Sequence, residues 1–270
     1  MEIKEWNKFL LPYEQAVEEL KIKFKSLRTG LRREGEYSPI EFVTGRVKKV
    51  SSILEKAKKL DIPMGEIEEK VEDIAGIRVI CQLVEDIYKV VQMVRRRNGR
   101  DLTIVYEKDY VESTKDSGYR SYHIIIRYPV QVANGEKEIL AEIQIRTLSM
   151  NFWATIEHSL NYKYKHNIPA EITERLRKAA EAAFRLDREM SEIRSEIMEA
   201  QQTFEAKSNL VSDILNGINT LHLSGKTKEA LDYQKRFNHL LDQADNLEFS
   251  QLAADINCMI AKYGLMSKKI

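Results

Sequence analysis

Cysteine is scarce in this sequence, and its two cysteines, Cys81 and Cys258, lie far apart in apolar surroundings. Neither has the spacing of a metal ligand, and two distant cysteines do not form a disulfide framework. No apolar run is long enough to span a bilayer, and the charged N-terminus MEIKEWNKFL lacks the apolar stretch of a signal peptide. We therefore expect a protein of the reducing cytoplasm that has no membrane partner.

The sequence also lacks an excess of charge of either sign. Its 43 Lys and Arg residues almost balance its 42 Asp and Glu residues, so the formal net charge is +1. A field over the whole molecule that would attract nucleic acid is therefore absent, and any anion site must be a local cluster. The 270 residues, 43% hydrophobic and 31% charged, suit one or two soluble domains rich in amphipathic helix.

Apolar residues recur at helical spacing over residues 2–34, and a second helix is expected near 44–60. The first helix has a basic stripe at the same period, made of Lys21, Lys25, Arg28 and Arg32. A solvated face is the simpler interpretation of such a stripe. The second helix places Lys48, Ser52, Lys56 and Lys59 opposite its apolar side.

Strand-like alternation follows, first in 73–83 and 102–111, and then in SYHIIIRYPVQV and KEILAEIQIRT. The last two segments are joined by Asn134-Gly135, a strong signal for a two-residue hairpin loop. Such a loop pairs Ala133 with Glu136, so that odd positions of one strand oppose even positions of the other.

Opposed residues of a hairpin share one face of the sheet. Tyr119, Ser121 and His123 are therefore expected on the face that holds Glu142 and Gln144, opposite the isoleucines of the core. A carboxylate, an imidazole and an aromatic ring would converge there. A polar outer face that only contacts water is the alternative explanation of this pattern.

The second half of the sequence is helical. TLSMNFWATIEHSLNYKYKH predicts a helix, and after Pro169 apolar residues form a heptad seam that packs on its own domain or on another subunit. The seam consists of Ile172, Leu176, Ala179, Ala183, Leu186, Met190, Ile193 and Ile197. From about 203 two or three further helices follow, with a boundary near 203–208. Ser224-Gly-Lys-Thr227 lacks the earlier glycine of a P-loop and predicts a helix–helix turn.

One constellation of polar residues remains in the first 160 positions. Asp73 opens one strand and Glu142 lies on another, and two carboxylates on a rigid sheet suit Mg²⁺. The surrounding cations are those that polyphosphate needs, and Arg can also stack on a base. They are Arg46, Lys48, Lys56 and Arg78, with Lys115, Tyr119 and His123 on the other side. The set suits two nucleotides and metal-assisted phosphoryl or pyrophosphoryl transfer. A single-strand RNA platform or an inert nucleotide sensor stays open.

Four motifs in order closely resemble the small alarmone synthetases of the RelA/SpoT homologue superfamily, in their stand-alone, synthetase-only branch. They are FVTGRVKKVSSILEKAKK, VEDIAGIRVICQ, SGYRSYHIIIRYP and EIQIRTLSMNFWATIEHSLNYK. The resemblance covers residues 1–202 and leaves 203–270 as a helical extension of unknown role. It implies an α+β fold, with a mixed sheet of about five strands flanked by helices in a nucleotidyltransferase-like arrangement.

The same resemblance implies transfer of pyrophosphate from ATP to the 3′-hydroxyl of GDP or GTP, which gives (p)ppGpp and AMP in the stringent response. Asp73 would hold Mg²⁺, and Glu142 would complete the metal site and act as general base on the acceptor hydroxyl. The ATP side would consist of Arg46, Lys48, Ser52, Lys56 and Arg78, the two arginines sandwiching the adenine. The GDP or GTP side would consist of Lys115, Tyr119, His123 and Gln144, with Tyr119 stacked on guanine.

Members of this branch that form homotetramers can bind the product in a central cleft and be stimulated by it. The matching residues here are Lys21, Lys25, Arg28, Glu41, Phe42, Thr44 and Asn151. The resemblance therefore favours a homotetramer with pppGpp as allosteric activator, no nucleic acid being required, and reverses the simpler interpretation of the basic stripe. Lys59 and Lys108 depart from the arginines that related sequences often have.

Two rival functions stay open at this point. One is a related pyrophosphokinase that acts on adenine nucleotides or on the tRNA 3′ end. The other is a catalytically silent nucleotide- or RNA-binding protein, against which the presence of both Asp73 and Glu142 argues.

Overall fold

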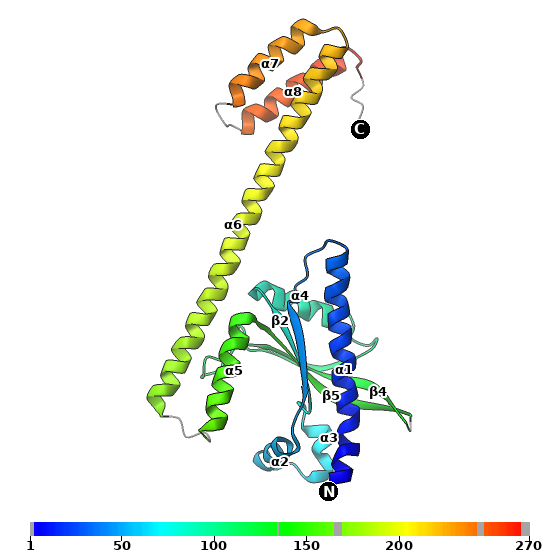
Figure 1. The fold of residues 1–270 in the computed structure, drawn as a ribbon, viewed down its shortest axis with the longest axis vertical. Helices are drawn as coiled ribbons and strands as arrows, with labels where there is room; N and C mark the ends of the chain where they lie inside the picture. The colour runs from blue at the N-terminus through cyan, green and yellow to red at the C-terminus, as the bar shows by residue number, and fades with distance from the viewer. Residues whose placement is uncertain (1–2, 134, 165–168, 242–245, 266–270) are drawn as a thin grey trace. The chain divides into compact units, whose positions relative to one another are not determined.

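The computed structural model of the chain describes residues 3–133, 135–164, 169–241 and 246–265 (Figure 1). The first half contains both strands and helices, and the second half is helical. The first half comprises α1 (Ile3–Arg33), β1 (Phe42–Val47), α2 (Val50–Lys59), a 3-10 helix (Met64–Glu66), α3 (Ile67–Lys70), β2 (Ala75–Cys81), α4 (Val84–Arg95), β3 (Thr103–Asp109), β4 (Tyr122–Val132) and β5 (Gly135–Thr147). The second half comprises α5 (Leu148–Lys163), α6 (Ala170–Leu223), α7 (Thr227–Leu241) and α8 (Asn246–Lys262).

The five strands form one mixed sheet in the order β1-β2-β5-β4-β3. Only β2 and β5 run parallel, and the other neighbouring pairs are antiparallel. The predicted α+β fold, with a mixed sheet and flanking helices, is therefore confirmed. This order puts the chemistry-bearing strand β5 in the centre of the sheet, between β2 and β4.

Alternation along the strands separates a buried apolar face from a polar face. Ile77 and Val79 of β2 and Ile143 and Ile145 of β5 are fully buried, and they share one core with apolar residues of α1 and α4. The helices α1 and α5 lie on opposite sides of the sheet (Figure 1). The polar face therefore lies on the α5 side.

The helix expected near 44–60 was wrong over its first residues, because β1 occupies Phe42–Val47 and α2 begins only at Val50. Val43 is buried in the core, and β1 pairs with β2 as an edge strand. Gly45 explains the close packing at this edge. A Cβ there would come within 2.7 Å of Val17 Cγ1 on α1, so only glycine lets the helix cross the strand at this distance.

The β4–β5 hairpin has the predicted parity but not the predicted pairing. Glu136 pairs with Gln131 and not with Ala133, and Gly135 already belongs to β5. Asn134, the other residue of the expected turn, lies outside the described residues. Because the pairing differs by two positions, each side chain keeps its face, and His123 lies directly opposite Gln144.

The chain divides into two compact units, unit 1 (Met1–Glu192) and unit 2 (Ile193–Ile270). Helix α6 runs without a break through residues 203–208, where the sequence suggests a boundary, so a functional division there stays a prediction. Unit 2 has a core of its own, centred on Ile214, Phe249 and Ile256. Residues Ser224–Thr227 join α6 to α7, which confirms a helix–helix turn in place of a P-loop.

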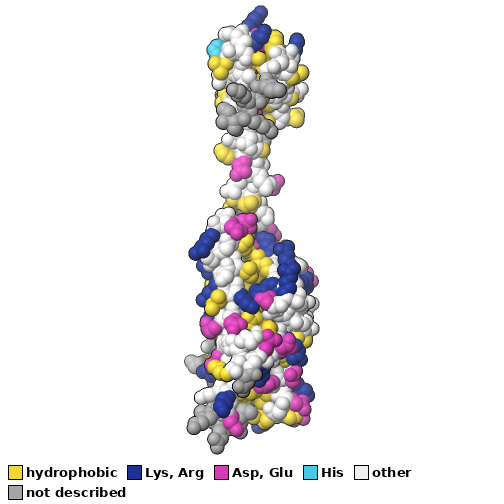
Figure 2. All heavy atoms as spheres, turned by 90° about the vertical axis from the view of Figure 1, so that its right-hand side faces the viewer, with side chains coloured by type: hydrophobic (Ala, Val, Ile, Leu, Met, Phe, Trp, Pro, Cys, Tyr) yellow, Lys and Arg dark blue, Asp and Glu magenta, His cyan; other side chains and the backbone are white. Residues whose placement is uncertain are grey.

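Two surface features bear on partners. The predicted seam on α6 leaves Leu186, Met190, Ile193 and Ile197 exposed. Figure 2 shows positive and negative side chains interspersed over the α1 side of unit 1, in keeping with the balanced composition. None of the helices in the described ranges combines the length and apolar character needed to cross a bilayer.

Candidate functional site

The polar face of the sheet is organised in two neighbouring rows of paired residues. One row runs Arg46, Gly76, Glu142, Ile125 and Tyr106, and the other runs Thr44, Arg78, Gln144, His123 and Lys108. Paired residues of neighbouring strands point to the same face. The rows therefore place two arginines on the β1–β2 side, a histidine on the β4 side, and Glu142 with Gln144 between them.

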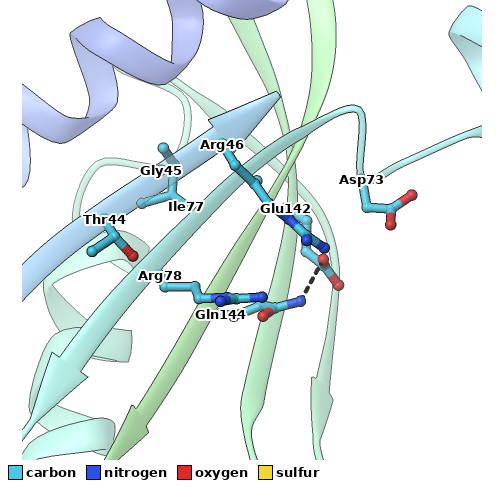
Figure 3. A pocket seen from close by; sticks show the side chains of 9 residues that line it. Thr44, Gly45, Arg46, Asp73, Ile77, Arg78, Glu142 and Gln144 are labelled. Carbon is cyan, nitrogen blue, oxygen red and sulfur yellow. Dashed lines mark hydrogen bonds between the residues drawn. The ribbon is translucent and has the colours of Figure 1, made fainter. Parts of the chain in front are cut away.

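A cavity of about 130 Å³ opens over the β1–β2 end of these rows (Figure 3). Its lining consists of Thr44, Gly45, Arg46, Asp73, Gly76, Ile77, Arg78, Glu142 and Gln144. Gly76 stands in the row between Arg46 and Glu142, and its missing side chain leaves this space open. The predicted ATP-side arginines and the two predicted metal carboxylates thus share one cavity.

Asp73 sits between two lysines at the start of β2. Its Oδ2 accepts a hydrogen bond from Lys48 Nζ at 2.7 Å, and its Oδ1 accepts one from Lys56 Nζ at 2.7 Å. Burial acts to raise the pKa of this carboxyl, but the two lysine hydrogen bonds outweigh it and hold the pKa below its usual range. Asp73 is therefore ionised at neutral pH. Ser52 lies on α2 four residues before Lys56, so both face the same side of that helix.

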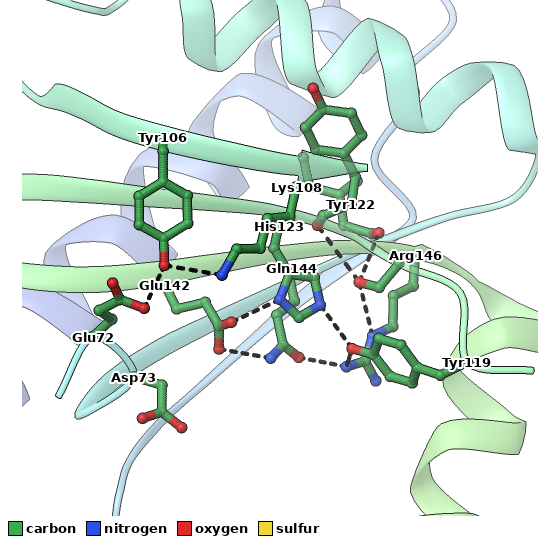
Figure 4. Close-up of polar contacts among 12 residues, drawn as sticks. Glu72, Asp73, Tyr106, Lys108, Tyr119, Tyr122, His123, Glu142, Gln144 and Arg146 are labelled. Carbon is green, nitrogen blue, oxygen red and sulfur yellow. Dashed lines mark hydrogen bonds and ion pairs between the residues drawn. The ribbon is translucent and has the colours of Figure 1, made fainter. Parts of the chain in front are cut away.

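Glu142 is held by two neighbours on the polar face (Figure 4). His123 Nδ1 lies 2.7 Å from its Oε1, and Gln144 Nε2 donates to its Oε2 at 2.7 Å. Burial acts to raise the pKa of Glu142, but the interactions with His123 and the hydrogen bond from Gln144 together outweigh it, and the resulting pKa lies below the usual range. The carboxylate is thus ionised and oriented, as a general base must be.

The acceptor side gathers around an aromatic ring. Tyr119 OH lies 2.8 Å from His123 Nε2, and Lys115 Nζ stands 5.0 Å from the centre of the Tyr119 ring and 4.3 Å from that of Tyr110. Burial lowers the pKa of Lys115, with Lys108 and Arg146 adding to that effect against Glu142. The predicted set Lys115, Tyr119, His123 and Gln144 is therefore one connected group.

Gly118 is required where the loop before β4 meets α6. Its φ of +85° favours glycine, and a Cβ there would lie 2.7 Å from Ala180 Cβ on α6. The glycine therefore lets the loop before β4 pack against α6, and in this way fixes the loop that presents Tyr119.

Three residues escaped the sequence-based assignment of the site. Arg146 on β5 donates to Tyr119 OH and to Gln144 Oε1, each at 2.6 Å. Glu72 accepts a hydrogen bond from the hydroxyl of Tyr106, which belongs to the same row as Glu142. His158 of α5 has a lowered pKa, because burial and then the charges of Arg46 and Arg78 disfavour its protonation. The parity of β5 was the available signal for Arg146, which shares the even positions of Glu142 and Gln144.

The two carboxylates of the cavity have the chemistry of ligands for a divalent cation. Asp73 and Glu142 line the same cavity, and the charge of Asp73 is felt at Glu142, where it acts to raise the pKa. Within the described ranges, no cluster of three or more His, Cys, Asp or Glu side chains could hold a metal by itself. Mg²⁺ is commonly bound by one or two carboxylates together with waters and substrate phosphates, so the two carboxylates fit it.

The predicted regulatory residues lie on three elements. Lys21, Lys25 and Arg28 are on α1, Glu41 directly precedes β1, Phe42 and Thr44 belong to β1, and Asn151 is on α5. Glu41 accepts hydrogen bonds from Arg32 at 3.2 Å and from Gln82 at 3.0 Å. The structure brings Lys21 to the β1 crossing, since a Cβ on Gly45 would lie 2.9 Å from its Cδ. Helix α5, which contains Asn151, lies on the other side of the sheet from α1 (Figure 1).

Comparisons with known proteins agree with this architecture. The family described as a region found in RelA / SpoT proteins matches residues 45–167, inside unit 1. The GTP pyrophosphokinase YjbM of Bacillus subtilis (strain 168) is 58% identical over 207 residues, which are 77% of this chain and 97% of that protein.

Two solved structures add the fold. The crystal structure of small alarmone synthetase 1 from Bacillus subtilis bound to its product pppGpp has a TM-score of 0.69 and 59% identity, and the match covers 72% of this chain and 98% of that one. The same synthetase bound to AMPCPP has a TM-score of 0.64 and 56% identity, over 73% and 99% of the two chains. With its motifs in order on the same fold, the chain belongs to the RelA/SpoT family and, within it, to the small alarmone synthetases.

Proposed function

We propose that the protein is a GTP pyrophosphokinase that transfers pyrophosphate from ATP to the 3′-hydroxyl of GDP or GTP, giving ppGpp or pppGpp and AMP. The observation that supports it most is the pair of residue rows, which set an arginine-lined cavity and an aromatic, cationic group on opposite sides of Glu142. Such an arrangement suits one nucleotide on each side of Glu142, which would act as the general base. The names of its relatives, a GTP pyrophosphokinase and a synthetase bound to pppGpp or to AMPCPP, support the same activity.

The ATP side uses the β1–β2 end of the cavity. Arg46 and Arg78 would hold the adenine between planar guanidinium groups, which stack on aromatic faces. Lys48 and Lys56, now paired with Asp73, would turn to the phosphates, and Ser52 lies one helical turn from Lys56. The ATP phosphates would thus take the place of Asp73 as the anionic partner of the two lysines.

On the GDP or GTP side, Tyr119 would stack on guanine. Lys115 and His123 would lie near the phosphates of this acceptor nucleotide, and Gln144 lies beside Glu142. Glu142 would take the proton from the 3′-hydroxyl. The 3′-oxygen then forms a bond to the β-phosphorus of ATP, the bond from that phosphorus to the α–β bridging oxygen breaks, and AMP leaves with the electron pair. A Mg²⁺ ion held by Asp73 and Glu142 would neutralise the developing phosphate charge.

We further propose a cytoplasmic homo-oligomer, expected to be a tetramer, that pppGpp activates through Lys21, Lys25, Arg28, Glu41, Phe42, Thr44 and Asn151. Three features support it. Asn151 belongs to α5, and α1 and α5 lie on opposite sides of the sheet (Figure 1), so one site that uses both helices would take residues from more than one copy. Thr44 also lines the ATP-side cavity, which would connect such a site to catalysis. The exposed apolar seam of α6 supports association.

Product analysis tests this function. Purified protein is incubated with Mg²⁺ and ATP alone, ATP plus GDP, ATP plus GTP, or ATP plus tRNA, and nucleotides are separated by anion exchange. We expect ppGpp or pppGpp with an equal amount of AMP only where a guanine nucleotide is present. Pyrophosphorylated adenine nucleotide or tRNA would identify the protein as the related pyrophosphokinase with that acceptor. The absence of product in every reaction would favour a catalytically silent binding protein.

The base is tested in the same assay. Glu142→Gln should lower kcat by roughly 10²- to 10⁴-fold, the range that general bases contribute. Glu138→Gln, an exposed residue of the same strand and parity, is the matched control. Wild-type turnover by Glu142→Gln would show that the base is another group. Added pppGpp should raise the wild-type rate, and an unchanged rate would overturn the regulatory proposal.

A further inference from the structure

Arg146 is a buried cation of the polar face, and none of the carboxylates in the described part of the chain forms an ion pair with it. Its residue is only 4% exposed. Within the described residues its hydrogen bonds go to neutral oxygens, at 2.6 Å to Tyr119 OH, 2.6 Å to Gln144 Oε1 and 3.3 Å to Ser121 Oγ. Burying a charge without a counter-charge is costly, and an apolar side chain of similar volume often stabilises a core equally well. Stability alone therefore gives little reason for an arginine here.

The contacts of Arg146 belong to a closed hydrogen-bond ring of five residues (Figure 4). One arm runs from Arg146 through Tyr119 and His123 to Glu142, and the other runs from Arg146 through Gln144 to Glu142. Every link of the ring measures between 2.6 and 2.8 Å. The ring therefore joins the stacking tyrosine of the acceptor side to both oxygens of the base.

Arg146 and Glu142, at opposite points of the ring, fix the direction of four of its five hydrogen bonds, and the direction of the Tyr119–His123 bond follows when His123 is neutral. A guanidinium can only donate, and an ionised carboxylate can only accept. Because Arg146 donates to Tyr119 OH, the hydroxyl's own proton is free to go to His123 Nε2, and the imidazole then donates from Nδ1 to Glu142. On the other arm, Gln144 must present Oε1 to Arg146, which leaves its NH₂ group for Glu142.

We propose that Arg146 is a positioning residue: by donating into both arms, it sets the orientation of the groups that hold the base and ties the acceptor-binding ring to it. Stacking of the guanine on Tyr119 and alignment of the ribose 3′-hydroxyl of the same nucleotide with Glu142 then depend on one buried cation. This inference rests on the proposed function, and it adds a residue to the nucleotide contacts and catalytic groups proposed above.

Steady-state kinetics with ATP and GDP test the proposal in Arg146→Met, Arg146→Lys and the control Arg127→Met, whose exposed guanidinium on β4 pairs with Glu69 outside the ring. Arg146→Met should lower kcat/KM for GDP by about 10- to 100-fold, as outer-shell partners of active-site groups typically do, with the KM for ATP unchanged. Lysine keeps donors on a single nitrogen, so Arg146→Lys should recover part of the loss. The control should match wild type.

A second variant separates positioning from folding. Tyr119→Phe keeps the ring for stacking but removes the hydroxyl link, so its effect on kcat/KM for GDP should be less than additive with that of Arg146→Met. Additive effects would overturn the ring as a unit. Equal losses for ATP and GDP with a lowered thermal midpoint would show a structural role only. If the wild type forms no product from ATP and GDP, the proposed function fails first, whereas an active wild type with unchanged Arg146→Met kinetics overturns this inference alone.

Discussion

At the scale of single residues, the absence of a side chain at position 76 is as informative as the charges around it. Gly76 occupies the row position between Arg46 and Glu142, where every other nearby row position has a side chain on the polar face. A Cβ there would lie 3.7 Å from the Arg46 backbone oxygen and 3.9 Å from its Cγ, which are ordinary contacts. Backbone packing therefore tolerates a side chain at this position, and the cavity is what it would fill.

We predict that Gly76→Val raises the KM for ATP strongly and that Gly76→Ala raises it less, because each added carbon occupies space between the arginine and the base. The unfolding free energy should change little or rise slightly, since glycine inside a strand costs stability relative to a residue with a side chain. ATP titrations at saturating GDP and urea unfolding measure the two quantities.

Gly45→Ala serves as the contrasting variant. Its new Cβ would meet Val17 Cγ1 at 2.7 Å and Ile77 Cδ1 at 3.1 Å, so overpacking should cost roughly 1–3 kcal/mol of unfolding free energy. If Gly76→Val lost stability in the same way and kept the wild-type KM for ATP, the cavity over Gly76 would not be the ATP site.

At the scale of elements, the sequence predicted the GDP or GTP half of the site better than the ATP half. Alternation in β5 placed Glu142 and Gln144 on one face, and hairpin parity added His123 even though the pairing differed by two positions. Parity survives such an error because a shift of two residues leaves every side chain on its face.

The ATP half of the site depends on features that the alternation of apolar and polar residues does not encode. The short edge strand β1 contains Gly45 and is followed directly by the helical period of α2, so its residues were assigned to that helix. The β1–β2 pairing, which brings Arg46 beside Gly76, is a contact between segments 30 residues apart in the chain. The Arg146 ring was likewise outside reach, because its hydrogen-bond directions require all five side chains in place.

Helix α6 is fixed to the end of β5 by a buried carboxylate. Asp187 is 5% exposed, and its Oδ2 accepts hydrogen bonds from Thr147 Oγ1 at 2.6 Å and from Ser149 Oγ. Burial raises the pKa of Asp187 against the opposing effect of the two hydroxyls. A carboxyl whose pKa is raised on folding contributes stability below its unfolded pKa, about 3.9, and this contribution is lost as the pH rises through the folded value.

We predict that Asp187→Asn becomes more favourable relative to wild type as the pH rises from about 4 to 7, because asparagine stays neutral where the buried aspartate must ionise. The quantity to measure is the difference in unfolding free energy between variant and wild type at each pH. Groups that titrate in both proteins cancel from it. Thr147→Val should act in the opposite direction, since removing a donor raises the pKa of Asp187 further. A difference that stays constant with pH would show that Asp187 titrates alike in both states.

At the scale of the whole molecule, the two units have separate hydrophobic cores. The core of unit 1 joins the sheet to α1 and α4, while that of unit 2 joins the C-terminal part of α6 to α7 and α8. Every residue assigned to the proposed active site belongs to unit 1, as does the whole of the family match. Damage to the second core should therefore leave the chemistry intact.

We predict that Phe249→Ala destabilises unit 2 alone. Its ring is fully buried against Phe237, and removing such a ring typically costs about 3–5 kcal/mol. Calorimetry of the full chain should show two transitions, of which only one moves, while kcat and both KM values keep their wild-type values. Phe204→Ala on α6, where the ring is 74% exposed, should move neither transition. A single transition that falls as a whole, together with lost turnover, would mean that α6 couples the two cores and that unit 2 supports catalysis through folding.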